Sequence, residues 1–69
     1  MEFTKFIEGV DRMYAAYKGE WRWGQCLFNG LAHFRPDLSE QLRATELDPF
    51  HHEKNELPSE FWDWLATHW

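Results

Sequence analysis

The chain has 69 residues, the length of one small domain, and a net charge of −5 from 12 acidic residues against seven Lys and Arg. This balance argues against direct binding to nucleic acid, whose phosphate backbone needs basic patches, and the single Cys excludes an internal disulfide. No apolar run has the length of a signal peptide or of a membrane-spanning helix, so we expect a cytoplasmic protein that does not bind membranes.

Residues 3–18 carry apolar side chains three and four positions apart, which is the spacing of an amphipathic helix. The apolar positions are Phe3, Phe6, Ile7, Val10, Met13, Tyr14 and Tyr17. Lys18 suits the last turn of this helix, and Gly19 suits the position just past its end. Gly9 lies inside the helix, where Gly is about 1 kcal/mol less favourable than Ala, so we expect another helix to approach closely there.

A second helix is predicted over residues 21–34. Its apolar stripe consists of Trp23, Leu27, Leu31 and Phe34, with Phe28 at the margin. Residues 19–21 are a short connection to the first helix, and so short a connection predicts two antiparallel neighbours. Pro36 ends the second helix, because the residue before a proline is pushed out of the α region.

The rest of the chain is predicted to form two shorter helices with a loop between them. The segments are a helix over residues 36–45, a loop over residues 46–57 and a helix over residues 58–68. Pro36 and Pro58 suit the first turns of the two helices, and Phe50 is expected to reach the core from the loop. We therefore predict an all-α fold for the single domain 1–69, a compact bundle of three to four short helices whose first two helices form an antiparallel hairpin.

The apolar stripes together predict the core of this bundle. Its expected members are Phe6, Ile7, Val10, Met13, Tyr14, Trp23, Leu27, Phe28, Leu31, Phe34, Leu38, Leu42, Phe50, Phe61 and Leu65. Aromatic residues are numerous, with six Phe, five Trp and two Tyr. They supply much of the area that a chain this short can bury, because each aromatic side chain buries roughly 150–250 Å².

The residues that could carry chemistry do not form a recognisable site. His51, His52 and Glu53 are the most metal-like cluster, but adjacent His side chains diverge, and the spacing of a zinc-binding helix is absent. Cys26 and His33 are about 10 Å apart along a helix, which is too far for a hydrogen bond. We therefore expect no enzyme activity, no catalytic residue, no cofactor and no metal, and we expect Cys26 to pack as a small hydrophobic residue.

The five Trp are more informative, because Trp is rarely fully buried and is enriched in binding hot spots. The candidate interaction surface consists of Trp21, Trp62, Trp64 and Trp69. On the last helix, Phe61 and Leu65 should face the core, so that Trp64 lies largely outside it. An exposed Trp64 beside Trp21, or beside a helix of another copy, would form a self-complementary patch, which predicts a weak homodimer. Alternatively, the Trp side chains cap a small core and pack on each other.

Three unusual residue combinations follow one another along the chain. They are WR-x-GQ-x-x-FN at residues 21–29, RPDL at residues 35–38 and R-x-T-x-x-DPF at residues 43–50. Together with a final aromatic-rich helix that ends in Trp, this pattern resembles a group of short uncharacterised proteins of phages and bacteria. The resemblance covers nearly the whole chain and implies a compact, all-helical, stand-alone module encoded by a phage. It implies no activity and no catalytic residues.

Polar residues of the second helix and its flanks are candidate anchors for the loop that follows. The candidates are Arg22, Gln25, Asn29 and Arg35. The two Arg flank the helix and can pair with loop acids such as Glu46 and Asp48. The Gln and the Asn lie four positions apart on one face, from which they can form hydrogen bonds to the backbone of residues 45–50. Alternatively, they are exposed and make no such contact.

An excess of aromatic residues without a catalytic constellation favours a non-enzymatic protein–protein interaction module. For a phage-encoded module of this kind, we expect the role of an inhibitor or adaptor that acts on a host protein. One alternative is a nucleic-acid mimic that occupies a basic groove of a DNA- or RNA-binding protein. Such a mimic would gather on one side the acids Glu40, Glu46, Asp48, Glu53, Glu56, Glu60 and Asp63. Another alternative is a small structural homo-oligomer.

Overall fold

The computed structural model describes residues 1–17 and 19–69, and the regular structure within them is helical. The elements are α1 (Phe3–Ala16), α2 (Trp23–Phe34), α3 (Pro36–Leu42), the 3-10 turn η1 (Lys54–Glu56) and α4 (Ser59–His68). The all-α prediction is therefore confirmed, although α3 ends before the predicted boundary. The predicted role of Lys18 lies outside the described residues. In this part of the chain, no helix is long and apolar enough to cross a membrane.

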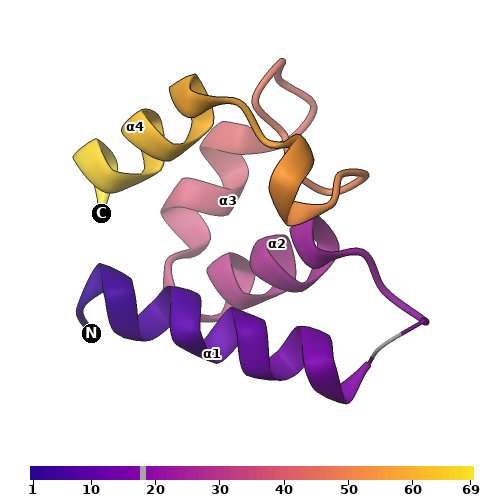
Figure 1. The fold of residues 1–69 in the computed structure, drawn as a ribbon. Helices are drawn as coiled ribbons and strands as arrows, with labels where there is room; N and C mark the ends of the chain where they lie inside the picture. The colour runs from indigo at the N-terminus through magenta and orange to yellow at the C-terminus, as the bar shows by residue number, and fades with distance from the viewer. Residues whose placement is uncertain (18) are drawn as a thin grey trace.

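The first two helices form the predicted antiparallel hairpin (Figure 1). Gly19 lies in their connection with a φ of +89°, a left-handed conformation that Gly adopts without strain. The helices approach closely at Gly30, where an added Cβ would lie 3.1 Å from the ring of Phe6. The expectation of a close approach at Gly9 is wrong, because an added Cβ at that position meets nothing within 4 Å.

The buried core draws on all the α-helices and on the loop before α4. Its members are Phe6, Val10, Trp23, Cys26, Leu27, Leu31, Leu38, Leu42, Leu57, Phe61 and Leu65. The core predicted from the sequence lacks Cys26 and Leu57, which are buried in the structure. Four residues that were predicted to be in the core are only half-buried: Ile7, Met13, Tyr14 and Phe50. Phe34 was placed in the core wrongly, since it is 50% exposed. It is the last residue of α2 and meets Phe6 edge-on at 6.3 Å, which leaves its outer face in solvent.

The loop between α3 and α4 crosses the beginning of α2 in direct backbone contact. The amide of Gly24 donates a hydrogen bond to the carbonyl oxygen of His52 at 2.8 Å. A Cβ added at Gly24 would lie 1.7 Å from the carbonyl oxygen of Pro49 and 2.7 Å from that of His52. Because both obstacles are backbone atoms, the contact depends on the absence of a side chain at this position.

The end of α4 closes the bundle against the beginning of α1 (Figure 1). The indole N–H of Trp69 donates to the carbonyl oxygen of Met1 at 2.9 Å. The Trp69 ring lies on Phe6, with ring centroids 4.8 Å apart, and on Phe3, with centroids 5.8 Å apart. Segments far apart in the sequence therefore share one aromatic cluster.

We predict that Gly24→Ala destabilises the protein by about 3 kcal/mol or more, since the loop backbone must move away to admit the methyl group. The measurement is urea unfolding followed by circular dichroism. Gly9→Ala is the matched control, since the same substitution there meets open space and gains up to about 1 kcal/mol of helix propensity. Equal stabilities of the two variants would contradict the close contact at Gly24.

Candidate functional site

The Trp residues of the candidate interaction surface are half-buried and pack against the core. Trp21 stacks on Tyr17 at 4.6 Å, just beyond the last residue of α1, whereas Trp69 lies on Phe3, the first residue of α1. These two positions are about 20 Å apart along a helix of this length. Trp21 and Trp69 therefore do not belong to one patch. The packing of the four Trp against the core agrees with the first part of the alternative interpretation, in which they cap a small core, but no aromatic pair among the described residues joins two of the four.

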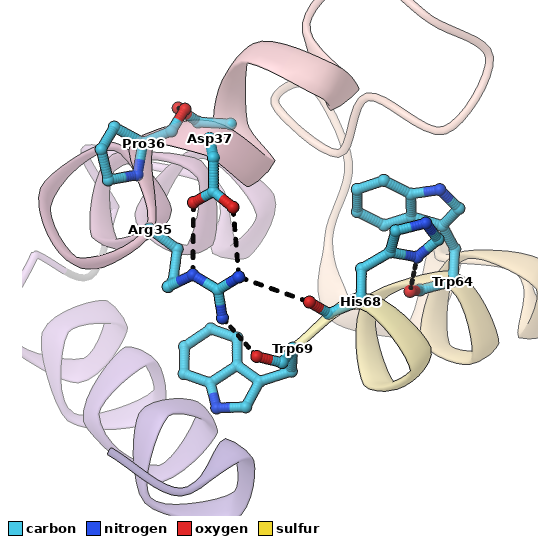
Figure 2. A network of polar contacts seen from close by, with 7 residues as sticks. Arg35, Pro36, Asp37, Trp64, His68 and Trp69 are labelled. Carbon is cyan, nitrogen blue, oxygen red and sulfur yellow. Dashed lines mark hydrogen bonds and ion pairs between the residues drawn. The ribbon is translucent and has the colours of Figure 1, made fainter.

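Trp64 was expected to lie largely outside the core, and that expectation is wrong. It is half-buried, and it stacks on His68 with ring centroids 4.1 Å apart (Figure 2). Trp64 lines a pocket with Leu42, the last residue of α3, and Leu47, from the segment that follows α3. Trp21 lines a different pocket, beside Gln25. The self-complementary patch that Trp64 and Trp21 were expected to form is therefore not assembled within one copy of the chain.

Arg35 is an anchor, but for the end of α4 rather than for the loop acids (Figure 2). Its guanidinium donates to both carboxylate oxygens of Asp37, at 3.2 and 3.1 Å. It also donates to the main-chain oxygens of His68, at 3.4 Å, and of Trp69. The guanidinium carbon lies 5.4 Å from the centre of the Trp69 ring. A cation is favourable at a helix C-terminus, so Arg35 fixes α4 to the junction of α2 and α3.

The other candidate loop anchors do not hold the loop. Arg22 is exposed. Among the hydrogen bonds of the described residues, none joins the side chain of Gln25 or Asn29 to residues 45–50. Asp48 holds the loop instead, because its carboxylate accepts hydrogen bonds from the amides of Ala44 at 2.8 Å and Phe50 at 3.0 Å. The loop is thus folded by its own residues, and the expected pairing of Asp48 with Arg is not formed.

The loop is attached to α2 through a cluster of contacts around Trp23. The amide of Trp23 donates to the Glu53 carboxylate at 3.2 Å, and its indole N–H donates to Asp11 at 2.8 Å. The ammonium group of Lys54 lies 3.1 Å from the same Asp11 carboxylate and 5.2 Å from the centre of the Trp23 ring. The negative charge of Glu53 also raises the pKa of the nearby Tyr14 hydroxyl. The cluster ties α1, α2 and η1 together.

The predicted chemistry-bearing residues take up structural or exposed positions. Glu53 is part of the cluster around Trp23, and the neighbouring His51 and His52 are exposed. Cys26 is fully buried, and burial raises the pKa of its thiol, whereas His33 is exposed. Across the residues that the structure describes, no group of three or more His, Cys, Asp or Glu is placed to hold a metal ion.

A groove between α1 and α2 was not anticipated from the sequence. It holds about 220 Å³, and two of its walls are the most exposed large apolar side chains that the structure describes, Met1 at 70% and Phe34 at 50%. The buried residues Phe6, Val10 and Gly30 form its floor. Because Gly9 lies along it without a side chain, we call it the Gly9 groove.

The remaining lining residues of the Gly9 groove are Lys5, Arg12 and Met13. Both charged members are basic and exposed. An adjoining pocket of about 330 Å³ shares Met1 and Phe34 with the groove. It extends the apolar surface to the ring of Trp69. The only indication of this site in the sequence is Gly9, which is unfavourable inside a helix. From the sequence, we explained this residue by a close approach of another helix.

Comparisons with models of protein families, with curated proteins and with solved structures found no match to this chain.

We predict that Asp37 stabilises the fold at neutral pH and that this stabilisation is lost in acid. The hydrogen bonds from Arg35 lower the pKa of Asp37 below its ordinary value of 3.8, so its contribution is present above that value and is lost as the pH falls through the folded-state pKa. Urea unfolding of the wild type and of Asp37→Asn should therefore differ at neutral pH and converge once the pH falls below the folded-state pKa of Asp37. In an Arg35→Met background, Asp37→Asn should lose this pH-dependent effect; a constant difference at every pH would contradict the pairing.

We also predict that the thiol of Cys26 is protected in the folded protein, because it is fully buried and its pKa is raised. Its reaction with a disulfide reagent such as Ellman's reagent should follow the rate of unfolding and become fast in denaturing urea. Rapid modification of the folded protein, with its circular dichroism unchanged, would show instead that Cys26 is accessible and reactive.

Proposed function

We propose that the protein is a non-enzymatic protein–protein interaction module and that it binds its partner through the Gly9 groove. The observation that supports this most strongly is the position of Met1 and Phe34. They are the most exposed large apolar side chains of the described residues, and they line the same groove. Exposed apolar surface is unfavourable in water, by roughly 25 cal/mol per Å², and its burial by a partner recovers that free energy.

The extent of the apolar surface supports a macromolecular partner. The Gly9 groove holds about 220 Å³ and continues into the adjoining pocket of about 330 Å³, which shares Met1 and Phe34 with it. A surface that continues from α1 to Trp69 suits several side chains presented by a larger partner. If the module is encoded by a phage, as the resemblance implies, we propose that it acts as an inhibitor or adaptor of a host protein.

The nucleic-acid mimic receives less support. It requires acids that face outward, but three of the acids it would present accept hydrogen bonds from backbone amides. Asp48 binds the amides of Ala44 and Phe50, Glu53 binds that of Trp23, and Glu56 binds that of Glu53. These carboxylates keep their charge, and Glu56 is exposed, but their hydrogen bonds fix them within the fold of the loop and leave them less free to pair with a basic groove.

Photo-crosslinking tests the interaction module. We expect that the protein carrying benzoylphenylalanine in place of Phe34 forms a discrete adduct with one partner in cells, and that the adduct is lost when Gly9→Leu fills the groove. The matched control places the same crosslinker at Tyr17, which is exposed but outside the groove. An adduct pattern that is the same from both positions, or that survives Gly9→Leu, would rule out the Gly9 groove as the binding site.

A further inference from the structure

The Gly9 groove has the opposite charge to the protein as a whole. The chain carries a net charge of −5, yet the charged residues that line the groove are Lys5 and Arg12. Lys5 has a loose, exposed pair with Glu8 at 4.0 Å, and such surface pairs contribute little. Within the described residues, no ion pair involves Arg12. An apolar floor with a basic rim calls for an occupant that is apolar at its centre and acidic at its margin.

The groove has the length for a short helix. Its α1 residues run from Lys5 to Met13, which is about 12 Å, or a little over two turns, at 1.5 Å per residue. Midway along these residues Gly9 leaves open space, and Phe34 and Met13 line the same groove. An occupant helix can place one large apolar side chain over Gly9 and others one turn away, which is the usual way in which an amphipathic helix binds a groove.

We propose that the Gly9 groove binds an acidic amphipathic helix of a partner protein, with an apolar anchor over Gly9 and carboxylates beside Lys5 and Arg12. This inference rests on the proposed function and adds the chemistry of the partner. Complementary charge at the rim speeds association and selects against basic helices.

A second copy of the chain fits the groove less well. Its exposed large apolar side chains are Met1, Tyr17 and Phe34 among the described residues, and two of these belong to the groove itself. Pairing two grooves face to face would bring Lys5 and Arg12 of both copies together, and like charges across an interface are unfavourable. The apolar stripe of α4 is already committed to the core through Phe61 and Leu65.

The test is a selection from a displayed library of helical peptides of about 18 residues, long enough to be helical alone. One face carries fixed apolar anchors, and the flanking positions vary among Glu, Gln and Lys. We expect the selected peptides to be enriched in Glu at the flanks and to bind at least about ten-fold more tightly, by fluorescence anisotropy, than their Lys counterparts. Affinity should fall as the salt concentration rises.

Matched variants locate the binding. Gly9→Leu should weaken the selected peptides by at least about ten-fold, whereas Ala15→Leu adds the same side chain to an exposed position of α1 outside the groove and should not. Arg12→Glu should also weaken binding, whereas Arg43→Glu makes the same charge change on another face and should have a small effect.

The results separate the partner's chemistry from the function. Failure to enrich Glu, or equal affinities for Gly9→Leu and the wild type, overturns the acidic helix; if the crosslinked adduct at position 34 still forms, the interaction module stands. If neither the adduct nor the enrichment is found, both proposals fall. A concentration-dependent dimer in sedimentation that Gly9→Leu abolishes would assign the groove to a second copy and overturn the acidic helix as well.

Discussion

The structure depends on the backbone contact between the beginning of α2 and the loop that precedes α4. The residue before α2, Arg22, provides no side-chain hydrogen bond to the first amides of the helix, which must find partners elsewhere. The loop supplies them, through the carbonyl of His52 and the carboxylate of Glu53. This arrangement is possible because Gly24 admits the loop to a distance that any side chain would prevent. The same loop brings Lys54 to Asp11 and so attaches α1.

The sequence predicts well what depends on local spacing. The periodic apolar residues identified α1, α2 and α4, and Pro36 marked the boundary between α2 and α3. Phe34 was misplaced for a related reason: the spacing of its stripe is correct, but the helix ends at Phe34 and its neighbours cover only one side of the ring. Periodicity shows which face of a helix a residue occupies, and it does not show how far along the helix the packing continues.

The sequence could not predict contacts between distant segments. Arg35 was recognised as an anchor because it flanks a helix, yet its partners include main-chain oxygens of His68 and Trp69, which no pattern around residue 35 indicates. The close contact at Gly24 has no local signal either, since its neighbours Pro49 and His52 are far away in the chain. Main-chain oxygens carry no sequence signature, so pairing rules based on charge led instead to the loop acids.

The glycines of α1 and α2 differ in what compensates for their low helix propensity. Gly24 admits the loop, and Gly30 admits the ring of Phe6, so packing inside the chain offsets the loss of about 1 kcal/mol relative to Ala at each position. At Gly9 an added Cβ would meet open space, and no contact within the described residues offsets the loss. Because Gly9 has no side chain, the groove beside Phe34 stays open. We therefore propose that an occupant of this groove compensates for the low helix propensity of Gly9, because the tryptophans are already used by the fold itself.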